Sequence, residues 1–434
     1  MRFGRPGRRY HKRPRKGRSA MSVPEETDTD WWTMLADPDF LADPHDRLDV
    51  LRAENPIHFD PASGCYFILG HAEFSEAMRN KAIGRDSRNW KGGWHSDPGF
   101  RERDPVAFRL FSLFQPQMIN VDGIDHARMR GVYEPAFRAQ AVAQLEGMVR
   151  EETERLIAAL PSDGRPVNLI DAYAQPMPLN VLCRLFDIPR DMADTVSDWS
   201  KKLIQIGDLM LTDQQKSDGL EALTAFKSYL REQLSVSSTG TEGSLMRLAL
   251  QGLDNGTLDE EETLTNLVAL LIAGHETTVT LIGIGLKLLL EHPKEMERLR
   301  AQPDLARNAA DETLRYDPGG NFLLRVAAQS CEIGGVKIPQ GAPVIGLLRA
   351  TNRDPARFKD PHRFDITRTG NAHHTFGGGA HFCLGAPLAR MEGRLAFQCL
   401  LSAFADIELQ EPPRWLNMGT NARSLESLIV TLKR

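Results

Sequence analysis

The chain has 434 residues, of which 41% are hydrophobic, and a chain of this size can bury a large core. It contains no internal repeat, so one large domain is a better prediction than several small ones. Lys and Arg number 53 against 58 Asp and Glu, but residues 1–20 hold nine basic residues and no acidic one. The remaining chain therefore has 44 basic and 58 acidic residues, a net charge of −14, which argues against nucleic acid as the main partner.

The basic segment at the N-terminus is set apart from the rest of the chain. Its charge would suit nucleic acid, an anionic lipid or an import receptor. Because Gly and Pro interrupt any helix there, we expect instead a disordered extension over residues 1–30, or a true translation start at Met21. Residues 31–434 are then the folded domain, with one exposed low-complexity loop between helices at 235–244.

Cysteine content and hydropathy predict a soluble, cytoplasmic protein. The five cysteines are an odd number without paired spacing and without a secretory signal, so we expect a reducing compartment and no disulfide framework. The longest apolar run, around 267–273, is too short to span a bilayer.

The first predicted elements include a small sheet. Residues 46–54 have helical spacing, two short strands lie between Ile57 and Leu69, and a helix follows over 71–82. Residues 85–99, rich in Gly, Trp and Asp, have no period and predict a long loop.

The middle of the chain is predicted to be mostly helical. Helical spacing runs from Asp125 to Leu290, with breaks near 161–165 and 187–190. Beyond it, the predicted elements are strands at 325–328 and 344–347, a hairpin over 331–338 and a helix over 384–404.

The most informative segment, residues 376–385, reads Phe-Gly-Gly-Gly-Ala-His-Phe-Cys-Leu-Gly directly before a predicted helix. Glycines allow the backbone to approach a flat ligand, and the positive end of the helix favours a thiolate at Cys383. The alternative is that Cys383 is an ordinary small buried residue.

This segment resembles the haem-binding loop of the cytochrome P450 family, in which the cysteine is the proximal ligand of the iron. The resemblance implies that Cys383 binds the iron of haem b, and a thiolate ligand favours cleavage of the O–O bond. It further implies that Phe376 shields the sulfur, that His381 donates to a haem propionate, and that Gly377 and Gly385 shape the loop. Plain packing or a surface position remains the alternative for Phe376 and His381.

A second motif lies in an unusually hydrophobic stretch that begins at Leu264, continues beyond Leu286 and predicts a long central helix. Its polar part, 273–278, resembles the family's oxygen-binding motif. The resemblance implies that Glu276 and Thr277 form the acid and hydroxyl pair that delivers protons during oxygen activation, although Asp is the commoner acid.

The same motif implies that Ala273 and Gly274 lie beside the haem, and that His275 faces away from it. The alternatives are a Thr277 hydroxyl bonded to a backbone carbonyl and a Glu276 carboxyl paired with an arginine.

Two sets of charged residues complete the resemblance. Glu312 and Arg315 have i, i+3 spacing on one helix face, and with Arg363 they match the family's structural Glu-Arg-Arg triad. The family's propionate clamp is matched by His126, Arg130, Arg325 and His381.

Three variable stretches are expected to border the substrate pocket: 90–114, 319–324 and 415–422. Within or near them the candidate contacts, each of which could equally be ordinary core, are Phe322, Leu323, Met418 and Leu270.

The implied architecture is a mainly α domain with small β-sheets, in which haem lies between the central helix and the helix after the cysteine loop. The implied reaction is hydroxylation of a small hydrophobic molecule, such as a terpenoid, steroid or fatty acid, by a monomeric enzyme. No flavin, nicotinamide or iron–sulfur motif is present, so ferredoxin and a ferredoxin reductase are the expected electron donors. A peroxide-driven oxidant and a haem sensor or carrier are the alternatives.

Overall fold

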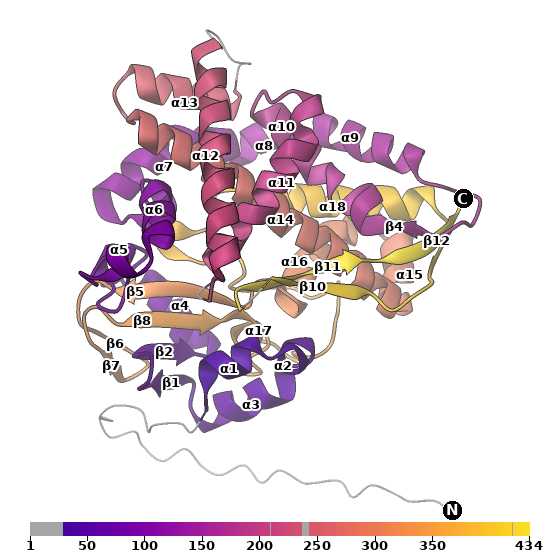
Figure 1. Cartoon of the computed structure of the whole chain (residues 1–434). Helices are drawn as coiled ribbons and strands as arrows, with labels where there is room; N and C mark the ends of the chain where they lie inside the picture. Colours follow the sequence, from indigo (N-terminus) through magenta and orange to yellow (C-terminus); the bar gives the residue numbers. More distant parts are fainter. Residues whose placement is uncertain (1–28, 209, 237–242, 419) are drawn as a thin grey trace, which may run out of the picture.

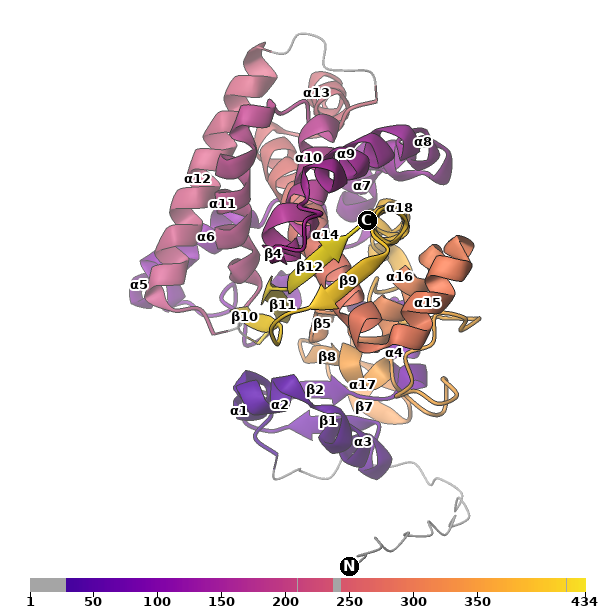
Figure 2. The same cartoon turned by 90° about the vertical axis from the view of Figure 1, so that its right-hand side faces the viewer.

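Helices gather around one long central helix, α14 (Glu260–Glu291), in the computed structural model, which describes residues 29–208, 210–236, 243–418 and 420–434 (Figures 1 and 2). The helices before α14 are α1 (Trp31–Ala36), α2 (Pro38–Ala42), α3 (His45–Glu54), α4 (His71–Arg79), α5 (Phe100–Arg103), α6 (Pro105–Phe114), α7 (Gly123–Phe137), α8 (Ala139–Gln144), α9 (Glu146–Ala159), α10 (Pro176–Leu185), α11 (Ala193–Ile204), α12 (Asp213–Val236) and α13 (Leu245–Asp254). Those after it are α15 (Pro293–Ala301), α16 (Ala306–Tyr316), α17 (Leu348–Thr351) and α18 (Ala386–Ala403).

The strands form small sheets. They are β1 (Ile57–Asp60), β2 (Cys65–Ile68), β3 (Ile83–Gly84), β4 (Val167–Asn168), β5 (Phe322–Ala327), β6 (Cys331–Ile333), β7 (Val336–Ile338), β8 (Pro343–Leu347), β9 (Asp406–Leu409), β10 (Arg414–Met418), β11 (Ala422–Ser427) and β12 (Ile429–Lys433). The largest sheet has the order β1-β2-β8-β5-β3, with β2 and β8 parallel and Tyr66 opposite Val344. A three-stranded sheet, β4-β12-β9, and the hairpins β6–β7 and β10–β11 complete the set.

Both faces of the five-stranded sheet are buried. Along β2, Tyr66 and Ile68 pack into one apolar cluster, whereas Cys65 and Phe67 pack into another that includes Trp31. This alternation follows from the two-residue period of a strand. A separate and larger core lies among the helices.

The central helix starts at a capping box: the Asp259 carboxylate accepts from the N–H of Glu262, whose carboxylate accepts from the N–H of Asp259. Among the residues that the structure describes, α14 is the one helix long and apolar enough to cross a membrane. Its most apolar window is 67% buried inside the protein, which is also typical of the core helix of a globular domain.

Most of the predicted elements are confirmed. The helix predicted over 46–54 is α3, the paired strands are β1 and β2, and the glycine hairpin is β6–β7. Helix α6 and the C-terminal strands were not predicted, because short elements next to loops carry little periodic signal. The extension predicted over 1–30, except its last two residues, and the centre of the loop predicted at 235–244 lie outside the described residues.

Candidate active site

The cysteine loop lies between the end of α4 and the start of α18. The N–H of Cys383 donates to the carbonyl of Phe376, at 2.9 Å, which closes the loop. Gly377 and Gly379 have φ of +70° and +66°, and a Cβ on Gly379 would lie 2.2 Å from the Met78 carbonyl oxygen. Only glycine therefore fits at 379, as the sequence predicted for this loop. Gly385 has an ordinary φ of −81° and caps α18.

The sulfur of Cys383 is placed among hydrogen-bond donors. Burial raises the pKa of this thiol, while the N–H groups of Gly385 and Ala386 and the charge of Arg130 act to lower it. A buried thiolate without a nearby cation is costly, and these donors alone do not offset its burial. Burial also raises the pKa of Cys65 and Cys183, so the feature that suits Cys383 to binding a metal cation as a thiolate is the set of donors around its sulfur.

The ring of Phe376 is held from one side by a charged group that the sequence did not reveal. The Arg390 guanidinium lies 4.6 Å from the ring centroid and donates to Asp311 at 2.7 Å. Nε2 of the buried His373 lies 3.4 Å from the same carboxylate oxygen. The three polar residues link α16, α18 and the cysteine loop around Phe376.

One row of residues on the central helix is exposed although most of the helix is buried. Ala273 and Thr277, one turn apart, are exposed, and Leu270 is half-buried one turn earlier. The hydroxyl of Thr277 donates to the Ala273 carbonyl at 2.6 Å, which is the local bond considered above as an alternative. Small and apolar side chains on an open face of a core helix suit a large flat ligand.

Glu276 points away from this row into the protein. Its side chain is buried, its Oε1 has no hydrogen-bond partner, and burial raises its pKa to about 7. No arginine of the described chain pairs with it, so the alternative role considered for this carboxyl is not observed. A carboxyl that titrates near neutral pH is suited to moving protons.

Two neighbours in the motif occupy other positions. His275 is buried and its Nδ1 lies 3.2 Å from Oγ of Ser200 in α11, so it faces away from the Thr277 row, as expected. A Cβ on Gly274 would lie 3.1 Å from Cδ2 of Leu182 in α10. Gly274 therefore allows close packing of α14 on α10, and its expected place beside the haem stays a prediction.

The four residues of the predicted propionate clamp lie around the same loop. The rings of His126 and His381 are 4.2 Å apart, and Arg130 donates to the Phe382 carbonyl at 3.0 Å. Nη2 of Arg325 lies 3.5 Å from the Cβ position of Gly377. Burial lowers the pKa of His126 to about 4, so at neutral pH this side chain is an uncharged donor.

Two further residues of this region were not predicted. Arg85 and Arg325 both donate to the Leu324 carbonyl, at 3.0 and 2.9 Å. Asp122 accepts the N–H groups of Arg85 and Asp86 and lies 2.8 Å from Nε2 of His381. Asp122 directly precedes α7, three residues before the start of the predicted helical segment, but nothing in the sequence indicated Arg85.

Burial and the charge of Arg85 together lower the pKa of Arg325 to about 9, although the Asp122 carboxylate acts to raise it. An excess of buried positive charge would be relieved by an anionic group. These residues therefore fit the two carboxylates of a haem.

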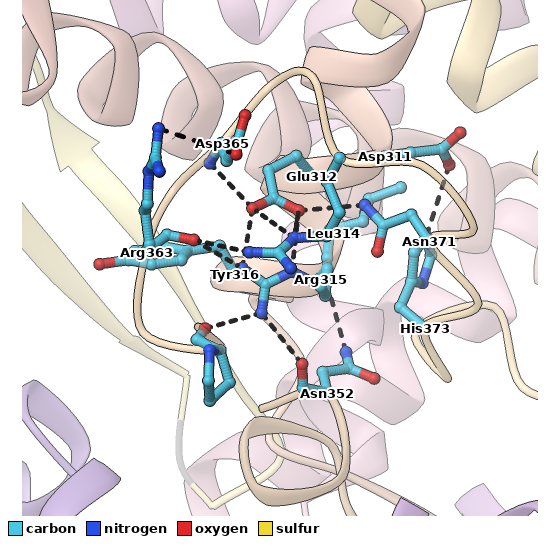
Figure 3. Close-up of polar contacts among 12 residues, drawn as sticks. Asp311, Glu312, Leu314, Arg315, Tyr316, Asn352, Arg363, Asp365, Asn371 and His373 are labelled. Carbon is cyan, nitrogen blue, oxygen red and sulfur yellow. Dashed lines mark hydrogen bonds and ion pairs between the residues drawn. The ribbon is translucent and has the colours of Figure 1, made fainter. Parts of the chain in front are cut away.

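The triad residues Glu312 and Arg315 form a fully buried bidentate ion pair, with both nitrogen–oxygen distances 2.8 Å (Figure 3). Arg363 is not its third member, which corrects the prediction: its guanidinium is 59% exposed and lies 3.8 Å from Asp365. Only its main-chain carbonyl takes part, accepting from Arg315. The second arginine on Glu312 is Arg368, at 3.1 Å, because the chain turns between the two positions.

The candidate substrate contacts divide into two groups. Phe322 is 5% exposed and packs in the cluster of Trp31, so it is an ordinary core residue and its assignment to the pocket is wrong. Leu323 and Leu270 are half-buried, and Cδ1 of Leu323 is 3.7 Å from the Cβ position of Gly377. Met418 ends β10, but its side chain lies outside the described part of the structure.

Residues of the stretch 90–114, which is expected to border the substrate, line a pocket of about 460 Å³ that is open to solvent. Its walls include Trp94, Phe108 and Arg101, and the Arg101 guanidinium lies 5.4 Å from the Phe108 ring centroid.

Comparison with known proteins decides the family. The family model for cytochrome P450 matches residues 220–422. A vitamin D(3) 25-hydroxylase of Pseudonocardia autotrophica is 35% identical over 85% of this chain and 87% of its own length. The chain belongs to the cytochrome P450 family.

A further relative and a solved structure support the same family. A 6-deoxyerythronolide B hydroxylase of Saccharopolyspora erythraea is 33% identical over 82% of this chain and 86% of its own. The crystal structure of P450BioI with an acyl carrier protein ligated to hexadec-9-enoic acid superposes with a TM-score of 0.83, at 28% identity, covering 91% of this chain and 100% of that one. This cytochrome P450 is thus a haem-dependent monooxygenase with the fold expected from its sequence.

Proposed function

We propose that this cytochrome P450 binds haem b through the Cys383 thiolate and hydroxylates a small hydrophobic molecule. The observation that carries the proposal is the placement of Cys383: its side chain is half-buried and its sulfur has the N–H groups of Gly385 and Ala386 beside it. The haem supplies the redox chemistry, in which O2, two electrons and two protons yield hydroxylated substrate and water.

The chain's own residues bind and orient the haem. Arg85 and Arg325 contribute buried positive charge for the propionates, with Arg130, His126 and His381 around the same loop. Gly377 and Gly379 let the backbone of the cysteine loop lie close to the ring.

Proton transfer is assigned to Glu276 and Thr277. Because burial raises the pKa of Glu276 to about 7, its carboxyl can hold or release a proton at neutral pH. The Thr277 hydroxyl faces the exposed row and can exchange its bond to the Ala273 carbonyl for one to a reacting oxygen.

Because no segment of the chain has a flavin or iron–sulfur motif, a ferredoxin and its reductase are proposed as the electron donors. The enzyme is further proposed to be cytoplasmic and monomeric. Relatives named for hydroxylation of vitamin D(3) and 6-deoxyerythronolide B support a hydrophobic substrate. The half-buried Leu270 and Leu323 are proposed to contact it.

The proton-transfer role predicts the phenotype of Thr277→Ala. This variant should still bind haem and substrate, but electrons from NAD(P)H should go largely to hydrogen peroxide because the hydroxyl no longer directs protons. The measurement is the ratio of product and peroxide formed to NAD(P)H consumed.

Thr265→Ala is the matched control, because the Thr265 hydroxyl makes the same bond to a carbonyl four residues earlier, at 2.6 Å, but in a buried part of α14. The control should keep the coupling of the natural protein. Equal coupling in Thr277→Ala and Thr265→Ala would contradict the assigned role.

A further inference from the structure

The buried carboxyl of Glu276 has neutral polar neighbours on the side of the helix that faces α11. Its Oε1 lies 3.3 Å from Nδ1 of His275, and that nitrogen lies 3.2 Å from Oγ of Ser200. His275 and Ser200 are both 0% exposed, so water does not reach them freely. The three side chains form one polar island between two packed helices.

An imidazole is well suited to a carboxyl that changes its protonation. Burial lowers the pKa of His275 to about 4, so its ring is neutral at pH 7. A neutral ring can donate from a protonated Nδ1 to a carboxylate, or accept at a bare Nδ1 from a carboxylic acid, depending on its tautomer. The Ser200 hydroxyl is within hydrogen-bond distance of the same nitrogen, so it helps to hold the ring beside the carboxyl.

The other charged group on this side is Lys201 of α11, which is exposed and acts on the carboxyl only over a distance. No arginine pairs with Glu276 in the described chain, and Oε1 makes no hydrogen bond of its own in this arrangement. The imidazole of His275 is therefore the polar group that lies against the carboxyl, at 3.3 Å, and a small rearrangement would make it a hydrogen-bond partner.

We propose that His275 and Ser200 are positioning residues of this enzyme: together they hold the Glu276 carboxyl and determine how readily it releases its proton. The proposal rests on the proton-transfer role given to Glu276 above. Neither residue needs to touch the haem or the substrate.

The direct readout is the carboxyl C=O band in the infrared spectrum of the holoenzyme, identified by its loss in Glu276→Gln. Its decrease with rising pH gives the pKa of Glu276. Removal of the imidazole in His275→Phe takes away the polar group nearest to the carboxyl, so the midpoint should shift by about one pH unit, upward if Nδ1 donates to the ionised form and downward if it accepts from the acid. His275→Gln retains a donor and an acceptor and should restore much of the shift.

Ser200→Ala tests the same island without altering α14, and Ser197→Ala is its matched control. Ser197 is also buried in α11, but its Oγ accepts from Gln175 at 3.1 Å instead of contacting His275. Ser200→Ala should shift the band of Glu276 and raise peroxide formation, whereas Ser197→Ala should change neither.

The proposal is overturned if folded, haem-loaded Ser200→Ala and His275→Gln or His275→Phe leave both the midpoint and the coupling unchanged. If His275→Phe does not fold, Ser200→Ala decides alone. A failure of the proton-transfer role gives a different result. In that case Glu276→Gln would form as much product per NAD(P)H consumed as the natural protein, even if the Ser200 and His275 variants shift the C=O band of Glu276.

Discussion

At the scale of residues, burial determines which charges matter. Glu312 and Arg315 are fully buried, and Arg368, at 11% exposure, adds the second cation on the same carboxylate. Removing one member of a buried network leaves its partners charged and poorly solvated, which costs more than the pair contributes. Exposed pairs such as Arg363 with Asp365 contribute little, because water screens them.

Substitution of Arg368 and of Arg363 should therefore have unequal effects on the free energy of unfolding. Arg368→Ala should lower the free energy of unfolding by about 3 kcal/mol, since Glu312 loses a partner and three carbonyls lose a donor. Arg363→Ala should change it by less than about 0.5 kcal/mol. Urea unfolding of both variants measures the difference. Equal losses of unfolding free energy would show that Arg363 is a member of the triad after all.

At the scale of elements, long periodic segments could be predicted and irregular ones could not. Helix α14 and the cysteine loop were found from sequence because a buried helix and a glycine-rich turn each require particular residue types. Arg368 was missed because the turn between 363 and 368 decides which side chain reaches Glu312, and that turn has no periodic signal. Arg85 was missed for a related reason: its partners, including Leu324, lie far away in sequence.

Phe322 was misplaced for a reason specific to strands. It lies in the stretch expected to border the substrate, but alternate residues of β5 face opposite sides of the sheet. Phe322 faces the cluster of Trp31, whereas its neighbour Leu323 lies near Gly377. That the stretch borders the substrate stays a prediction, and the face on which each of its residues lies depends on strand register, which a single sequence does not determine.

At the scale of the whole molecule, buried histidines make stability depend on pH. His374 is 6% exposed and stacks on His71 at 4.2 Å, and burial lowers its pKa from 6.5 to about 3. The unfolded chain therefore takes up a proton below pH 6.5 that the folded protein does not, so stability falls as the pH falls through this range. The raised pKa of Glu276 acts in the opposite direction, favouring the folded state at lower pH.

His374→Gln isolates this effect, because the contribution of Glu276 is the same in both proteins. The glutamine amide reaches the position of Nε2 and keeps an acceptor for the Ser75 hydroxyl, which lies 2.8 Å from Nε2 of His374, but it does not titrate. Between pH 7 and 5 the variant should lose about 2 kcal/mol less unfolding free energy than the natural protein. Identical pH profiles would show that the pKa of His374 is the same in the folded and unfolded states, contrary to this account.

The central claim is that Cys383 binds the haem iron as a thiolate, and the absorbance difference spectrum of the reduced, carbon monoxide-bound protein tests it most directly. The natural protein should give a strongly red-shifted Soret band, and Cys383→Ala should not. Cys399→Ala, which removes a buried thiol from α18, should keep the band. A band of the histidine type in the natural protein, or a red-shifted band that persists in Cys383→Ala, would contradict the claim.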